Sequence, residues 1–147
     1  MRFMLLMIPR VYQPGAELTA DELVGIPTAD QVAAMMKFNE DLQKGGHLVA
    51  LDGLHPLAKG ARIAFKGGKP IVTDGPFAET KEVLGGYWML QFASKEEAVE
   101  WAARCPAADG DVLELRQVQE MADFPADVQA EVSKFPELQP QAERRGA

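Results

Sequence analysis

The residues best suited to chemistry gather in TDGPFAETKE at positions 73–82. Asp74 ends an apolar run, and Gly75 and Pro76 force a turn directly after it. A carboxylate held at a strand end can act as a general base or orient an imidazole. The same carboxylate can instead stabilise the turn by accepting a hydrogen bond from backbone two residues on. The sequence leaves both roles open for Asp74.

The turn is followed by an apolar residue, Phe77, and then by a charged run that includes Glu79 and Lys81. Such a run is most often a solvated loop, but a lysine in it can also hold an anion as a point charge. Arg10 follows the first apolar run of the chain and could reach the same end of the sheet. We therefore expect a ligand site formed by Arg10, Phe77, Glu79 and Lys81.

The chain has two histidines, and His55 is the better candidate for proton transfer. Histidine is the side chain that titrates near neutrality. His55 lies beside a predicted strand break, and an acid–base pair with Asp74 would form if both lie at the same end of the sheet. The alternative is a rim histidine that packs on the turn. His47 begins a strand and is expected to be exposed.

The sequence lacks the usual motifs for metal binding, nucleotide binding and cysteine catalysis. The sequence has no HxH, CxxC or HExxH spacing for a metal, and no GxGxxG or Walker loop for a nucleotide. Cys105, one residue before Pro106, is expected to be a small apolar filler rather than a nucleophile. The sequence therefore predicts no metal site and no cofactor.

Length and charge restrict the class of protein. The chain has 147 residues, a formal net charge of −7 and one cysteine. This length fits one domain, and the acidic charge argues against nucleic-acid and anionic-lipid partners. The apolar run in MRFMLLMIP is too short for a signal peptide or a spanning helix. We expect a cytoplasmic protein with no membrane partner.

The residue pattern predicts an alternation of strands and helices around one hairpin. The predicted elements are a strand at 2–8 buried on both faces, a helix from 29 that stops at 45–46, a strand at 47–58 broken near 53, a hairpin at 61–75, a strand at 87–94, a helix at 95–105, a strand at 111–119 and a short helix at 125–135. Capping residues are expected at Thr19, Thr28 and Ser94. Helical spacing puts the following residues on the buried helix faces: Val32, Met35, Met36, Asn39 and Leu42 in the first long helix, and Ala98, Val99, Trp101 and Ala102 in the second.

This order predicts an α+β fold of the ferredoxin-like, split βαβ type, with an antiparallel sheet and both helices on one face. A second copy could cover the other face, which predicts a homodimer with a barrel-like interior. We expect one domain at 1–120 and a C-terminal extension at 121–147, whose last ten or so residues are flexible.

The segment TDGPFAETKE, with GARIAFKGGKPIV before it and GGYWMLQFASKEEAVEWAARCP after it, resembles the DGPF-domain branch of the YCII-related proteins. The resemblance covers about residues 1–120 and implies a dimeric α+β barrel. The resemblance also implies a pocket with a histidine–aspartate pair, as the wider group looks to have, and the relatives of that group include small lyases. Some DGPF-type proteins are linked to sigma factors, which implies a regulatory or stress role. The aspartate of that pair corresponds to Asp74. The histidine belongs in the first helix, where this chain has AAMMKFNEDL, so His55 would have to replace it.

Three functions remain open from the sequence. The first is a lyase- or hydrolase-type enzyme in which Asp74 is the base, His55 the proton shuttle, and Lys81 or Arg10 the anion holder. The second is a non-catalytic dimeric module that binds a small aromatic or anionic ligand, with a regulatory role. The third is a purely structural dimer.

Overall fold

The structure is a computed structural model, and it describes residues 1–18, 27–77 and 82–138. Internal contacts divide the chain into two units, Met1–Gln117 and Val118–Ala147, each of which is described by itself. The predicted capping residue Thr19, the predicted ligand-binding residues Glu79 and Lys81, and the predicted flexible end of the chain beyond residue 138 lie outside the described residues.

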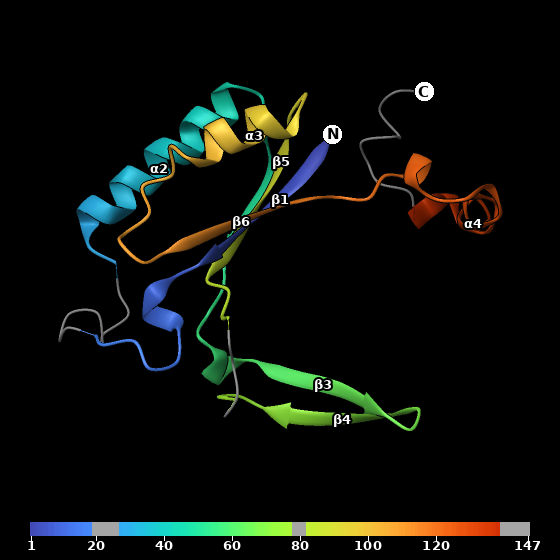
Figure 1. The fold of residues 1–147 in the computed structure, drawn as a ribbon, viewed down its shortest axis with the longest axis horizontal. Helices are drawn as coiled ribbons and strands as arrows, with labels where there is room; N and C mark the ends of the chain where they lie inside the picture. Colours follow the sequence, from blue (N-terminus) through green and yellow to red (C-terminus); the bar gives the residue numbers. More distant parts are fainter. Residues whose placement is uncertain (19–26, 78–81, 139–147) are drawn as a thin grey trace. The chain divides into compact units, whose positions relative to one another are not determined.

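The first unit is built on a four-stranded antiparallel sheet, whose strands are β1 (Arg2–Ile8), β2 (Leu48–Gly53), β5 (Gly86–Gln91) and β6 (Val112–Gln117). The strand order is β2-β5-β1-β6, so β1 is central and pairs with β5 and β6. This is the order of the split βαβ plan. The predicted α+β fold with an antiparallel sheet is confirmed (Figure 1).

Two helices, α2 (Ala29–Lys44) and α3 (Lys95–Ala102), lie on the same face of this sheet (Figure 1). The Thr28 hydroxyl accepts a hydrogen bond from the Gln31 backbone, and the Gln31 side chain accepts one from the Thr28 backbone. Ser94 caps α3 by accepting from the backbone of Glu97 at 3.1 Å. Both predicted helix starts are therefore confirmed, because each satisfies backbone donors that the first turn leaves free.

The core lies between the sheet and these helices. Its buried residues are Phe3, Leu5, Met7, Phe38, Leu42, Trp88, Leu90, Phe92 and Ala98. The predicted helix faces were partly wrong: Val32, Met36 and Val99 are 44%, 60% and 48% exposed. Phe38 is buried instead, because the buried stripe of α2 is centred on Phe38 and Leu42, four residues apart.

The opposite face of the sheet is less covered. Met4 and Leu6 of β1 are half-buried, whereas their neighbours Phe3 and Leu5 are buried. Within a single chain, the strand predicted to be buried on both faces is buried mainly on one face, although Ile8 at its end is also buried. Tyr87 pairs with Leu6 across the ladder and shares this open face.

The predicted hairpin is confirmed as β3 (Ala61–Lys66) and β4 (Lys69–Asp74). Gly67 and Gly68 have φ angles of 58° and 74°, which the two-residue turn of such a hairpin requires. All twelve residues of the two strands are exposed.

Short elements complete the description. Three-residue helical turns are formed by Arg10–Tyr12 (η1), Leu57–Lys59 (η2), Met121–Asp123 (η3) and Pro136–Leu138 (η4). The second unit also contains α4 (Ala126–Val132), which confirms the predicted short helix. No helix in the described part of the chain combines the length and apolar character needed to cross a bilayer.

Candidate functional site

The turn after Asp74 is fixed to the loop that follows His55. The Gly75 backbone donates a hydrogen bond to the Gly60 carbonyl at 2.8 Å. A Cβ atom on Gly75 would lie 1.8 Å from the Leu57 carbonyl oxygen. Gly75 does not adopt a positive φ. Glycine is required because two backbone segments meet with no room for a side chain.

Phe77 is half-buried just beyond this turn, and the Arg62 guanidinium lies over its ring at 4.2 Å from the centroid. This is a cation–π distance. The contact joins the segment after the turn to strand β3 and restricts the directions in which Arg62 can point.

Beside the turn is a hollow of about 420 Å³, which we call the His55 cavity. Its walls come from the end of β2, from η2, from the start of β3 and from the segment before β5. The lining residues are Leu54, His55, Pro56, Leu57, Lys59, Gly60, Arg62, Glu82, Val83 and Leu84. The cavity is therefore mostly apolar, with two cations, one carboxylate and one imidazole at its wall.

Hydrogen bonds hold the walls of the His55 cavity at both ends. The Leu54 backbone donates to the Gly85 carbonyl at 2.9 Å. The Gln13 amide accepts from the Val83 backbone N–H and donates to the Val83 carbonyl, both at 3.0 Å. Gln13 thereby connects two segments 70 residues apart. A ligand would meet a wall that is largely formed before it binds.

Only some of the predicted site residues meet here. His55 lines the cavity, and Asp74 does not. Asp74 is exposed at the end of β4 opposite Ala61, and it forms no hydrogen bond with His55 in the described structure. Arg10 lies elsewhere: its backbone donates to Asp111 at 2.8 Å and its guanidinium to the Glu17 carbonyl at 2.9 Å. Arg10 is therefore not placed as the anion holder of this cavity.

Two cations and one carboxylate of the cavity were missed from the sequence: Lys59, Arg62 and Glu82. Lys59 and Arg62 were interpreted as loop and strand residues. Their spacing from His55, four and seven residues along the chain, was the available signal. The spacing alone does not show that these side chains lie together. They line one hollow because the chain turns at Pro56 and η2.

Residues 1–122 match the family of YCII-related domains. The chain belongs to this family. It is also 41% identical over 59 residues to the "Uncharacterized protein R00369" of Rhizobium meliloti (strain 1021). This match covers 40% of the present chain and 48% of the relative, so it spans about half the length of that relative.

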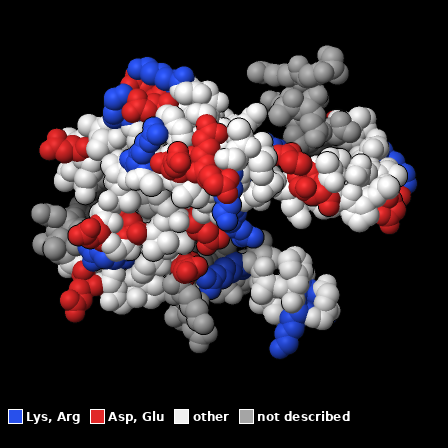
Figure 2. Space-filling view, turned by 45° about the horizontal axis from the view of Figure 1, so that its top comes forward, with Lys and Arg blue, Asp and Glu red and all other residues white. Residues whose placement is uncertain are grey.

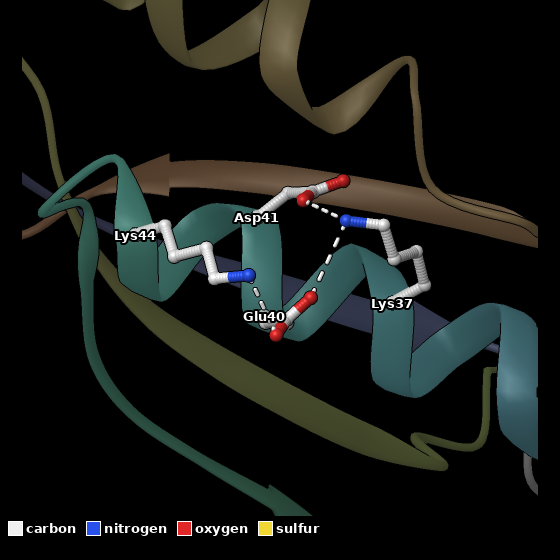
Figure 3. A network of polar contacts seen from close by, with 4 residues as sticks. All are labelled: Lys37, Glu40, Asp41 and Lys44. Atoms are coloured by element: carbon white, nitrogen blue, oxygen red, sulfur yellow. Dashed lines mark hydrogen bonds and ion pairs between the residues drawn. The ribbon is translucent and has the colours of Figure 1, made fainter.

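This YCII-related chain has a second hollow of about 480 Å³ between α2 and α3. Lys37 pairs there with Asp41 and Glu40, and Lys44 pairs with Glu40 at 2.7 Å (Figure 3). The third cation of this hollow, Arg104, lies over the Trp101 ring at 4.3 Å from the centroid. Hydrogen bonds donated by Lys44 and Lys37 lower the pKa of Glu40. Hydrogen bonds that Lys37 donates to Asp41 and Glu40 raise the pKa of Lys37. These exposed pairs at helical spacing stabilise α2 modestly. The His55 cavity is the better candidate site, because an imidazole lines it beside the cations.

His47 was expected to be exposed, and it is half-buried instead. Its ring stacks on Phe92 at 4.3 Å between ring centroids, and its Nδ1 lies 3.1 Å from the Gln91 carbonyl oxygen.

Within the described residues of this YCII-related chain, no three histidine, cysteine or carboxylate side chains group as a metal site.

Cys105 packs against the core, as expected for an apolar filler. Burial, and secondarily the charge of Asp111, raise the pKa of its thiol from 9.0 to about 11. Because the thiolate is the reactive form, we expect alkylation near pH 8 to be about 100-fold slower in the native protein than in the unfolded chain. Labelling with iodoacetamide, with and without guanidinium chloride, measures this ratio.

A Cys105→Ser, Ser133→Cys variant is the control, because Ser133 is exposed and its replacement should react at similar rates in both conditions. The raised pKa also means that the thiol favours folding below about pH 9 and that this contribution is lost as the pH rises toward 11. Equal native and unfolded labelling rates at Cys105 would contradict the inert role.

Proposed function

We propose that this chain binds a small organic anion in the His55 cavity, with the anionic group at Lys59 and Arg62. The single observation that supports this most directly is the wall composition: two cations and one imidazole in a mostly apolar hollow. Its volume of about 420 Å³ is within the roughly 300–1,000 Å³ that ligand sites usually occupy.

The two cations suit different parts of the same anionic group. The Lys59 ammonium is a compact point charge, whereas the planar Arg62 guanidinium can donate two parallel hydrogen bonds to a carboxylate. Stacking on Phe77 pre-orients that guanidinium, which lowers the entropy lost on binding. Leu54 and Leu84 supply apolar wall for a ring or alkyl body. An aromatic or short aliphatic carboxylate is therefore the proposed ligand class.

A second candidate function is proton transfer to or from that ligand, as in a lyase- or hydrolase-type enzyme. The observation in its favour is that His55 lines the same cavity as the cations. Binding is the better supported function, because Asp74 does not line the cavity and the described residues give His55 no carboxylate partner.

We propose that the chain belongs to the DGPF branch of its family. For the assembly, we propose a homodimer in which two copies cover each other's open sheet face. The half-buried Met4, Leu6 and Tyr87 on that face support the dimer, because an apolar sheet face normally requires a covering layer.

The binding proposal is tested by titrating the protein with benzoate, phenylacetate and short aliphatic carboxylates in a calorimeter. At least one of these probes should bind, and Lys59→Glu should weaken its binding by about 10–100-fold, because a charged hydrogen bond is replaced by repulsion. Lys95→Glu is the matched control, since Lys95 is exposed on α3 and does not line the cavity.

Absence of binding across the whole panel would refute the proposed ligand class. Equal weakening by Lys59→Glu and Lys95→Glu would show a general effect of net charge rather than a site. His55→Gln separates the two functions: a pure binding site keeps most of its affinity, whereas an enzyme would lose turnover of the probe.

A further inference from the structure

We propose that the β3–β4 hairpin is an arm with which each copy of this chain holds a second copy. The apolar face of the hairpin makes the contact. This inference rests on the homodimer proposed above and goes beyond it, because it adds a segment outside the four-stranded sheet to the interface.

The register of the hairpin separates its side chains into two faces. Ile63 lies opposite Val72 and Phe65 opposite Pro70, which places these four apolar residues on one face. The other face carries the basic residues Arg62, Lys66 and Lys69 together with Ile71. The hairpin is therefore amphipathic across its two faces, although neither face is buried.

The apolar face is exposed to an unusual degree. Ile63, Phe65 and Val72 are 60%, 77% and 64% exposed. An isolated two-stranded hairpin is only marginally stable in water and normally gains stability by packing on another layer. Adjacent large apolar side chains on a surface commonly mark an interaction site. The apolar face of the hairpin is therefore expected to pack against another surface.

The direction of the hairpin indicates which partner. It extends to the side of the sheet that faces away from α2 and α3 (Figure 1). The open sheet face with Met4 and Leu6 is on that same side. A second copy that covers this face would therefore lie within reach of the hairpin.

Charge favours the same partner. Residues 59–74 carry four basic side chains and one acidic one, a net charge of +3 in a chain of net charge −7. The rest of the chain therefore has a net charge of −10. The hairpin, at the lower right of Figure 2, shows blue side chains, whereas the sheet-and-helix part shows red side chains interspersed with blue ones. Because the basic side chains lie on the face opposite to the proposed contact, they attract an acidic second copy at longer range rather than through direct ion pairs.

Such a contact would also affect the His55 cavity. Lys59, Gly60 and Arg62 line that cavity and lie at or just before the start of β3. A hairpin held by a second copy would keep these wall residues in place. Ligand binding and dimer formation should then strengthen each other.

The experiment measures the dimer dissociation constant of the full chain by analytical ultracentrifugation without ligand. Val72→Lys, on the apolar face, is compared with Ile71→Lys, which is on the opposite face one residue away. Both residues are exposed, at 64% and 49%, so neither change should unfold a single chain. We expect Val72→Lys to raise the dissociation constant at least tenfold, and Ile71→Lys to change it by less than about threefold.

A wild-type protein that stays monomeric would overturn the homodimer and this inference with it. A wild-type dimer that Val72→Lys leaves intact would overturn the arm alone and leave the sheet-to-sheet dimer standing. Equal weakening by the two variants would also overturn it, because the apolar face would then not be the contact. The ligand titration described above tests the binding proposal by a separate measurement, because the His55 cavity is formed within one chain.

Discussion

Replacement of Gly75 by alanine is expected to lower the free energy of unfolding by about 2–4 kcal/mol and to abolish ligand binding. The new Cβ would lie 1.8 Å from the Leu57 carbonyl oxygen and 2.8 Å from its carbon. These are backbone atoms, which cannot rotate away as a side chain can. The turn must therefore move, and it loses the 2.8 Å hydrogen bond from Gly75 to Gly60.

Urea unfolding measures the stability of this variant, and calorimetric titration measures its binding. The matched control is Gly60→Ala, in the loop of the same chain whose carbonyl accepts the hydrogen bond from Gly75. The nearest neighbour of a new Cβ there would be the Leu57 carbonyl oxygen at 3.5 Å, an ordinary van der Waals distance. The Gly60 backbone is extended, at a φ of −111°, so alanine should cost less than about 1 kcal/mol there. Similar losses in both variants would mean that close packing at Gly75 is not what holds the turn.

Asn39→Ala is the second substitution with a large expected effect, a destabilisation of about 2–4 kcal/mol. Asn39 is 8% exposed on α2, and its Oδ1 accepts a 2.7 Å hydrogen bond from the indole N–H of buried Trp88. Alanine leaves that N–H buried without its acceptor and also leaves a cavity. Thermal or urea unfolding, followed by tryptophan fluorescence, measures the change.

A double-mutant cycle isolates the hydrogen bond from the cavity. Trp88→Phe removes the donor, so Asn39→Ala should cost at least about 1 kcal/mol less in that background than in the wild type. Gln43→Ala is the control on the same helix, because Gln43 is exposed one turn further on. If the two substitutions at Asn39 and Trp88 were simply additive, the hydrogen bond would contribute nothing to stability.

The order of elements was predictable because each boundary has a local chemical signal. The helix starts are set by hydrogen bonds between residues three apart, Thr28 with Gln31 and Ser94 with Glu97. The hairpin turn is set by two adjacent glycines with positive φ. The helix faces were less predictable, because Met36 and Phe38 are both apolar and only packing against Trp88 decides which is buried. Phe38 makes that contact, edge to face, with 6.1 Å between ring centroids.

The candidate site was predictable only at His55. The cavity depends on contacts between segments that are distant along the chain, such as Gln13 with Val83 and Gly75 with Gly60. No local pattern encodes such contacts. The motif drew attention to Asp74, whose carboxylate is exposed outside the cavity, while the cations that line it lie in the segment just after His55.

The alternation along β1 has an evolutionary consequence. Phe3 and Leu5 belong to the core, whereas Met4 and Leu6 lie on the face that we propose a second copy covers. Mutations at Phe3 and Leu5 would be tested by selection for folding, and those at Met4 and Leu6 by selection for self-association. If the proposed dimer forms, a lineage could change its oligomeric state through Met4 and Leu6 without disturbing the monomer's interior.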